Sequence, residues 1–508
     1  MIEQLPEGWI ATSLSEIASK LVDGSHNPPA KQATGLPMLS AVNINDNKIL
    51  FSDFRLITES EFKQEDQRTK IASGDVLLTI VGAIGRTAVV PEGIPQFTLQ
   101  RSVAVITPVL VPSKFLMYQI ESPRVAQYFK DNARGTAQKG VYLKTLGATE
   151  IWLPPLAEQH RIVAKIEELF SELDQGVASL KTAREQLKVY RQSLLKNAFE
   201  GKLTAAWRAA HRNQLETAAA LQQRIARERQ ARYQQQLADW QTAGQPGPKP
   251  KPPKPLPPLT AEELAELPEL PAGWVYSYLA DMGDLGRGKS KHRPRNDPRL
   301  FGGKFPFIQT GEVKAAHRII RSHSQTYSEF GLAQSKLWPK GTLCITIAAN
   351  IAETAFLGFD GCFPDSVVGF TAFEAVVRAE YIDYFIQAMR TRIEAYAPAT
   401  AQKNINLETL ESLVVPYCSH AEQEAVLCEL ESKLSEADQL DQTLATALQQ
   451  ADALRQSILK KAFHGQLVKQ DKNEEPATAL LERIRAARAA SPAKGRQAKL
   501  VSKSLTNC

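Results

Sequence analysis

Residues 283–290 carry the most suggestive chemical motif in the chain. They read GDLGRGKS and fit the G-x-x-x-x-G-K-S pattern of a nucleotide-binding loop. Such a loop must open a helix whose amino terminus faces the phosphates, whereas Pro294 and Pro298 follow closely and exclude a helix. We therefore interpret the segment as a basic, glycine-rich loop that contacts DNA phosphates, and not as an NTP site.

A second motif suggests methyl transfer to a base. Residues 27–30 read NPPA and resemble the catalytic tetrapeptide of amino-methyltransferases, in which a following aromatic side chain stacks on the flipped base. Ala30 offers no stacking face, and no glycine-rich turn suited to S-adenosylmethionine follows a strand. We interpret the segment as a proline-stiffened loop.

The sequence contains no complete pattern of metal-binding residues. Pro364-Asp365 followed by Glu374 imitates the acidic pair of a metal-dependent nuclease, but Val376 stands where that site needs a lysine. The eight histidines form no H-E-x-x-H pattern, and the five cysteines form no C-x-x-C pair. The sequence therefore predicts a chain with no catalytic residues, no metal site and no cofactor of its own.

The elements that position these segments occur twice. LPEGW at residues 5–9 returns as LPAGW at 270–274, TAQK at 136–139 returns at 400–403, and residues 191–203 match residues 455–467 at 9 of 13 positions. An internal repeat of this size predicts two structurally equivalent halves.

Each half has a β-rich front part and a helical back part. The front parts contain short apolar runs separated by Gly and Pro turns, which predicts mixed α/β domains. The back parts contain apolar residues at every seventh position, the pattern of a coiled coil. These positions are Ile166, Leu173, Leu180, Leu187 and Leu194 in the first half, and Leu430, Ala437, Leu444, Ala451 and Ile458 in the second.

We predict an α+β fold in which two long antiparallel helices separate two mixed α/β domains, with a pseudo-twofold internal repeat. A helix of roughly 44 residues would be about 66 Å long. Eight of the 13 residues from 246 to 258 are proline, which predicts a semi-rigid linker between the halves. The predicted parts are domain 1 (1–155), the central helix (156–203), a helical extension with the proline-rich linker (204–269), domain 2 (270–418), the distal helix (419–470) and a basic flexible tail (471–508).

Composition and charge limit the class of protein. The chain has 508 residues, of which 23% are charged, and a net charge of +6, which is compatible with a nucleic-acid partner. No apolar run is long enough to cross a membrane, and residues 1–6 do not resemble a secretory signal. We therefore expect a cytoplasmic protein without a membrane partner.

Five segments and their second-half counterparts carry a resemblance to a known family. They are LPEGW (5–9), DGSHNPP (23–29), GTAQKG (135–140), LPPLAEQ (153–159) and residues 191–203. On these segments the chain resembles the specificity (S) subunits of type I restriction-modification enzymes over residues 1 to 470.

The resemblance implies a DNA-recognition subunit without catalytic activity. Two target recognition domains would each read one half of a split site in double-stranded DNA, and the helices would act as a ruler and as docking surfaces for two modification (methyltransferase) subunits. Restriction (translocase and nuclease) subunits would join this core. S-adenosylmethionine, ATP and Mg²⁺ are then expected on the partner subunits. The alternatives are a self-contained DNA adenine methyltransferase or NTPase, and a purely structural coiled-coil adaptor.

Exposed basic and amide side chains in the loops are the candidate DNA contacts. Lys and Arg neutralise phosphates, while Gln and Arg can also form paired hydrogen bonds with bases. For each of them a solvated surface charge is the competing interpretation. The candidates are Lys31, Arg86, Gln138 and Lys139 in the first domain, and Arg287, Lys289, Lys291, Arg293, Arg295, Gln402 and Lys403 in the second.

Overall fold

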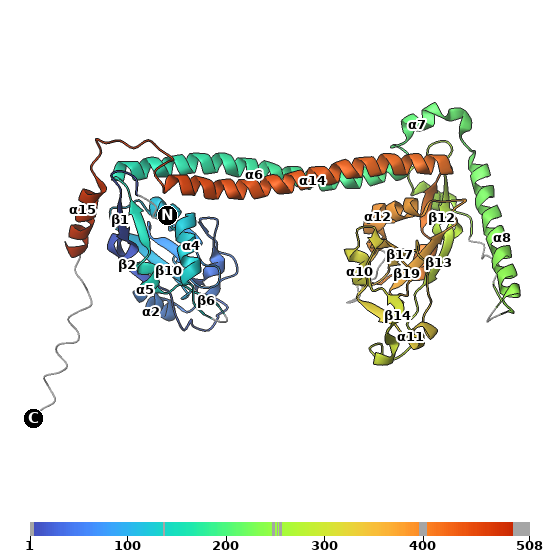
Figure 1. Ribbon diagram of the computed structural model, residues 1–508, viewed down its shortest axis with the longest axis horizontal. Helices are drawn as coiled ribbons and strands as arrows, with labels where there is room; N and C mark the ends of the chain where they lie inside the picture. The colour runs from blue at the N-terminus through green and yellow to red at the C-terminus, as the bar shows by residue number, and fades with distance from the viewer. Residues whose placement is uncertain are drawn as a thin grey trace, which may run out of the picture. The chain divides into compact units, whose positions relative to one another are not determined.

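The computed structural model describes residues 5–135, 138–245, 249–250, 252, 257–395 and 404–490. The chain forms two compact units. Unit 1 comprises Met1–Lys181 and Leu444–Cys508, and unit 2 comprises Thr182–Thr443. Each unit contains one α/β domain and a portion of each of two long helices (Figure 1). The fold is thus α+β with an internal repeat, as predicted from the sequence.

A four-stranded antiparallel sheet forms the centre of the first domain. Its strands, in spatial order, are β2 (Ala18–Asp23), β10 (Val103–Pro108), β7 (Val76–Thr79) and β8 (Thr87–Val89). Val76 and Leu78 of β7 pack into one apolar cluster and Leu77 into another, so both faces of the sheet are covered. This explains the uninterrupted apolar run VLLT in the sequence.

Smaller elements surround that sheet. A second sheet has the order β6-β3-β9, and β4 pairs with β5. The elements are β3 (Leu36–Leu39), β4 (Ile44–Asn45), β5 (Lys48–Ile49), β6 (Arg55–Ile57), β9 (Thr98–Leu99), α1 (Leu14–Ile17), α2 (Glu59–Thr69), α3 (Ser113–Ile120), α4 (Pro123–Asn132) and α5 (Leu143–Gly147).

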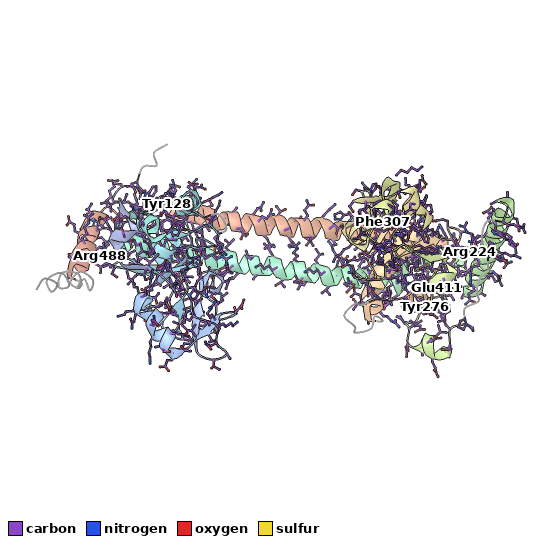
Figure 2. The ribbon with its side chains drawn as sticks, turned by 90° about the horizontal axis from the view of Figure 1, so that it is seen from below. Tyr128, Arg224, Tyr276, Phe307, Glu411 and Arg488 are labelled. Atoms are coloured by element: carbon purple, nitrogen blue, oxygen red, sulfur yellow. The ribbon has the colours of Figure 1, made fainter. Side chains whose placement is uncertain are left out.

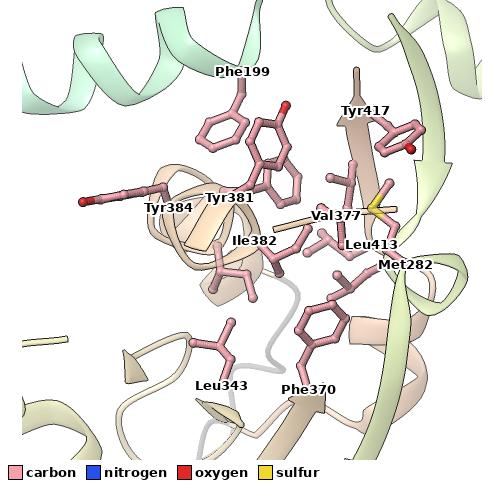
Figure 3. Packing of buried hydrophobic residues seen from close by; sticks show 14 of the residues in the cluster. Phe199, Met282, Leu343, Phe370, Val377, Tyr381, Ile382, Tyr384, Leu413 and Tyr417 are labelled. Carbon is pink, nitrogen blue, oxygen red and sulfur yellow. The ribbon is translucent and has the colours of Figure 1, made fainter. Parts of the chain in front are cut away.

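The second domain repeats this plan around a five-stranded sheet. Its spatial order is β13 (Gly283–Arg287), β19 (Val367–Ala372), β17 (Leu343–Thr346), β18 (Thr354–Leu357) and β15 (Ile319–Ile320). Phe370 of β19 and Leu343 of β17 face the helix α12 (Ala379–Ala395), whose Tyr381 and Ile382 are fully buried (Figure 3). The other elements are β14 (Phe301–Phe307), β16 (Gln325–Tyr327), α10 (Thr310–Ala315), α11 (Glu329–Ala333) and α13 (Leu407–Glu411).

Each domain begins and ends on paired strands. In the first domain β1 (Ile10–Ser13) pairs antiparallel with β11 (Glu150–Leu153), and in the second β12 (Val275–Tyr278) pairs with β20 (Val414–Tyr417). The chain therefore enters and leaves each domain at one place, directly before a long helix.

The long helices are α6 (Leu156–Phe199) and α14 (His420–Ala462). In unit 1 Ile166, near the start of α6, packs in one cluster with Ile458, near the end of α14. In unit 2 Leu194, near the end of α6, packs with Leu430, near the start of α14. The helices are thus antiparallel within each unit. All ten predicted heptad positions are buried or half-buried, which confirms the coiled-coil prediction.

The segments that recur most clearly in the sequence join the domains to these helices. Trp9 Nε1 donates to the buried carboxylate of Glu158 in α6 at 3.1 Å. Gly465 follows α14 with a φ of +68° and lies directly against Pro6. A Cβ at this position would come within 2.7 Å of the proline ring. Gly201 and Pro271 repeat this arrangement in unit 2. The recurring LPxGW and helix-end segments are therefore structural.

The prediction of a flexible tail over residues 471–508 is wrong for residues 477–490. From Ala477 to Ala490 the chain forms α15, whose Leu480 and Ile484 are buried in the apolar cluster of unit 1. Arg488, labelled in Figure 2, donates to the backbone carbonyl of Glu16 at 2.9 Å. Apolar side chains spaced four apart outweigh the basic composition that suggested disorder.

Helix α15 is a second copy of the start of α8 (Ala218–Thr242). Leu221 and Ile225 are buried in unit 2 at the spacing of Leu480 and Ile484. An acidic residue two positions before each helix pairs with an arginine inside it: Glu216 with Arg224, and Glu475 with Arg483 at 2.7 Å (Figure 2 labels Arg224). The repeat thus continues beyond residue 470. In the described part of the chain, two further helices flank α8 in the sequence: α7 (Ala205–Ala210) and α9 (Ala261–Ala265).

Candidate nucleic-acid interface

The loops that carry the predicted contacts leave the same end of each central sheet. In the first domain β2 and β7 run parallel to each other and antiparallel to β10, since Ala104 pairs with Asp23 and Val103 with Thr79. The loops after β2 and β7 and the turn before β10 therefore meet. In the second domain Val368 pairs with Arg287 and Val367 with Thr346, which gives the same arrangement. We call this surface the loop end of each domain.

The loop after β2 contains Lys31 and is anchored at its base. Ser25 N–H donates to the carbonyl of Leu99 at 2.8 Å, and His26 Nε2 lies 2.8 Å from Asp23 Oδ2. A Cβ at Gly24 would overlap the carbonyl of Leu99, so this close approach requires glycine. Lys31 is exposed farther along the loop.

The predicted glycine-rich loop at residues 283–290 is mostly a strand. Residues Gly283–Arg287 form β13, and the next helical element is the 3₁₀ turn Pro298–Leu300. A Cβ at Gly286 would lie 2.6 Å from the ring of Trp338, and one at Gly283 would overlap Phe370. Close packing of aromatic rings explains the glycine spacing, and the helix that an NTP site requires does not follow.

A basic loop, residues 287–299, continues from β13 and is held in one shape. His292 N–H donates to Gln334 Oε1 at 2.9 Å, and Ser335 Oγ donates to the carbonyl of Lys289 at 2.9 Å. Within the loop the side chain of Asp297 is buried, and hydrogen bonds from Arg299, with a further one from His292, hold its pKa far below the usual value. The loop thus presents its cations from a fixed backbone.

Its cations divide into anchored and free groups. Arg295 Nη2 donates to both carboxylate oxygens of Asp365 at 3.0 and 3.1 Å, and Arg287 Nε donates to the backbone carbonyl of Asp365. Arg293 Nη1 donates to the carbonyls of residues 290 and 292 at 2.6 and 2.8 Å. Within the described residues, the exposed side chains of Lys289 and Lys291 form no hydrogen bond or ion pair.

The second predicted group in the first domain also comes together. The N–H of Gly82 donates to the carbonyl of Lys139 at 3.1 Å, which places residues 138–140 against the turn that ends at Arg86. The side chains of Arg86, Gln138 and Lys139 are all exposed.

Gln402 and Lys403 lie outside the described residues. The residues that follow them repeat the first domain, because Ile405 N–H donates to the carbonyl of Ile347 at 3.0 Å and Val141 N–H donates to that of Ile80 at 2.8 Å.

The sequence prediction missed two cations at the loop ends. Arg101 is exposed in the turn before β10, and its N–H donates to the carbonyl of Ser25 at 2.8 Å. Lys336 Nζ lies 3.5 Å from the centre of the Trp338 ring. Partial desolvation of its ammonium group lowers the pKa of Lys336, and the positive charge of Lys289 lowers it further. Arg101 and Lys336 reach the loop ends through contacts between segments that are distant in sequence, which the sequence alone does not reveal.

The loop ends are suited to anion and base-edge contacts. They present guanidinium, ammonium and amide donors from anchored loops, the groups that bind phosphates and base edges. Among the residues the structure describes, there is no cluster of three His, Cys, Asp or Glu side chains that could hold a metal. Asp365, half of the nuclease-like pair, is instead a counter-ion for Arg295.

Comparison with known proteins agrees with this description. The family model for the type I restriction modification DNA specificity domain matches residues 6–181 and 271–449. The EcoKI specificity subunit of Escherichia coli K12 is 24% identical over 97% of this chain and 98% of its own length. The EcoBI specificity subunit of E. coli is 34% identical over 45% of this chain, a match that spans about half of that relative.

A solved structure from a study of type I restriction-modification complex assembly has the same fold. Its TM-score is 0.63, with 19% identity, over 91% of this chain and 99% of that one. None of these matches supports a self-contained methyltransferase or NTPase. In the described part of the chain, no helix has the length and apolarity needed to span a membrane. The chain belongs to the family of type I restriction-modification DNA specificity proteins.

Proposed function

We propose that this chain is the DNA-specificity subunit of a type I restriction-modification complex and reads a bipartite, asymmetric site in double-stranded DNA. One observation carries the proposal. The two domains present equivalent anchored loops with different side chains: residues 24–31 read GSHNPPAK and residues 288–295 read GKSKHRPR. Two readers that share a fold but differ at the reading surface fit a site with two unlike halves.

We further propose the division of labour along the chain. Residues 1–155 and 270–418 would be the target recognition domains, and the helices 156–203 and 419–470 would set the number of base pairs between the half-sites. Residues 204–269 would connect the two halves. The chain would perform no catalysis itself.

The outer face of the helices supports docking of two copies of one partner. Gln192, Ser193 and Lys196 are exposed on α6, and the identical residues Gln456, Ser457 and Lys460 are exposed on α14. The buried neighbours in these segments are explained by packing within each unit, but these six side chains face solvent. We propose that each triplet contacts one modification (methyltransferase) subunit, and that restriction subunits join that assembly. S-adenosylmethionine, ATP and Mg²⁺ would bind those partners.

Binding measurements on the purified chain separate this function from its rivals. The proposal predicts that the chain alone binds neither labelled S-adenosylmethionine nor ATP, and that with its methyltransferase partner it directs methylation to one bipartite site. Tight binding of either cofactor by the chain alone would favour an enzyme. Assembly with the partner without any effect on which DNA is methylated would favour a structural adaptor.

A matched pair of helix variants tests the docking faces. The variants Lys196→Glu and Lys460→Glu should each reduce the number of methyltransferase subunits bound from two to one, measured by the mass of the complex. Lys181→Glu, at an exposed position of α6 outside both triplets, is the control and should leave two bound.

A further inference from the structure

Phe330 is an exposed aromatic side chain at the loop end of the second domain. It belongs to α11 (Figure 1) and is 44% exposed. The helix lies against the basic loop of residues 287–299, because His292 N–H donates to Gln334 at the end of α11 at 2.9 Å. That loop contains six Lys or Arg and one acidic residue. Single exposed apolar residues are common on protein surfaces, but this one stands within a cationic surface suited to DNA.

Two polar side chains hold the Phe330 ring in place. The guanidinium carbon of Arg299 lies over the ring, 5.2 Å from its centre. The ring of His292 packs edge-on, also with 5.2 Å between the ring centres. The buried Asp297 fixes both neighbours, since its carboxylate accepts a hydrogen bond from Arg299 Nη2 at 2.7 Å and lies 2.7 Å from His292 Nε2. The aromatic ring is therefore presented to solvent from a fixed position.

The first domain has a serine at the equivalent position. The strands β6 and β16 correspond, because each pairs with the strand that precedes it in its small sheet and is followed directly by a helix-capping residue. These caps are Thr58 of α2 and Ser328 of α11. Two residues after the cap, the first domain has the exposed Ser60 where the second has Phe330. The aromatic ring thus belongs to one of the two reading surfaces and not to the shared fold.

We propose that Phe330 contacts the 5-methyl group of one thymine in the half-site that the second domain reads; this inference rests on the proposed function. The thymine methyl is the apolar group that base edges present in the major groove, and phenylalanine is among the side chains that contact it. Insertion of the ring between base pairs is the other use of an apolar side chain on DNA. It would require both faces of the ring, and Arg299 covers one of them. Phe330 would therefore add an apolar specificity contact that the cations of the loop do not supply.

Deoxyuridine substitution tests this contact, because uracil differs from thymine only by the missing methyl group. The complex of the full chain with its methyltransferase subunits is titrated with the duplex that contains the methylated site, in which each thymine of both half-sites is replaced in turn. At one position of the half-site read by the second domain, the parent complex should bind about fourfold more weakly, the value for burial of one methyl-sized group. Phe330→Ala should bind the thymine and deoxyuridine duplexes of that position equally and keep the parent's response at every other position.

Matched variants serve as controls. Phe330→Leu keeps an apolar side chain and should retain the response to deoxyuridine at the same position. Ser60→Ala, at the equivalent position of the first domain, should leave the response at every position unchanged. Because Phe330→Ala removes no charge, the slope of log K against log salt should equal that of the parent.

The remaining outcomes would overturn the inference. If no deoxyuridine replacement in the second domain's half-site weakens binding by the parent, the methyl contact does not exist, and this result needs no variant. If Phe330→Ala responds to every replacement as the parent does, the contact belongs to another residue. Loss of the methyltransferase subunit from Phe330→Ala, with the response to deoxyuridine intact, would assign the ring to that partner. If the parent complex did not prefer the methylated site to a duplex of random sequence, the proposed function itself would fail.

Discussion

Arg191 of α6 pairs with Asp438 of α14 at 2.7 Å, and the equivalent residues of the repeat, Arg455 of α14 and Asp174 of α6, form the same pair with the helices exchanged. Each pair lies within one unit. The two units are thus built on the same helix contact, in which the start of one helix meets the end of the other.

One difference between these pairs gives a stability prediction. The guanidinium of Arg455 also lies 4.3 Å from the centre of the Phe170 ring, where the repeat has Leu434 in the other unit. Exposed ion pairs contribute about 0–1 kcal/mol, and a cation over an aromatic ring about 0.5–1 kcal/mol more. In urea unfolding, Arg455→Ala should therefore lower the free energy of unfolding more than Arg191→Ala does. The difference should vanish in a Phe170→Leu background, and its persistence there would contradict the assignment.

Removal of the ammonium of Lys289 tests the nucleotide-loop motif. Because β13 is a strand with no helix after it, Lys289→Ala should leave ATP hydrolysis by the assembled complex unchanged. It should also make the salt dependence of DNA binding shallower by about one phosphate contact. Saturable ATP binding by the isolated chain that this substitution abolishes would contradict the structural interpretation.

Glu121 should make the stability of the first domain depend on pH. It accepts hydrogen bonds from Thr87 Oγ1 at 2.7 Å and Asn47 Nδ2 at 2.6 Å, and burial raises its pKa above the ordinary 4.5. The favourable contribution of the protonated form is fully present below pH 4.5 and is lost as the pH rises through the folded-state pKa. Glu121→Gln keeps both acceptor contacts and does not ionise. Its free energy of unfolding relative to the parent should increase with pH across that range, whereas the exposed control Glu92→Gln should show no such trend.

Helix α15 should contribute to the stability of unit 1. Leu480 is 1% exposed in the cluster that includes residues of the first domain, so Leu480→Ala should lower the free energy of unfolding by about 2–5 kcal/mol. Thr478→Ala on the exposed face of the same helix should change it by less than about 0.5 kcal/mol. Equal effects of the two substitutions in chemical denaturation would show that α15 does not pack as described.

Much of the architecture was predictable because it follows from periodicity. The heptad positions from Ile166 to Leu194 identify a helix seam, and the recurrence of LPxGW identifies two halves. The strand at Gly283–Arg287 was not predictable, because its glycines are required by Trp338 and Phe370, which are distant in sequence. The helix α15 could have been found from the pattern E-x-A-x-A-L-x-x-R-I, which residues 216–225 and 475–484 share.

The candidate site was predictable by residue type and not by location. Exposed cations such as Lys31 and Arg86 could be proposed from the loops that contain them. Their gathering at one end of a sheet depends on strand pairing such as Asp23 with Ala104, which the sequence does not specify. For the same reason Arg101 was missed.

Duplication of one domain tests the central claim, that each domain independently reads one half of the site. Residues 14–149, between β1 and β11, are replaced by residues 279–413, the equivalent segment between β12 and β20, so that the Trp9–Glu158 contact is kept. Methylated bases are then mapped by sequencing DNA from cells that carry the variant and its partners. Because the helices are antiparallel, the account predicts an inverted repeat in which both halves equal the half-site that the second domain reads in the parent. An unchanged asymmetric site, or two new half-sites unlike either original, would contradict it.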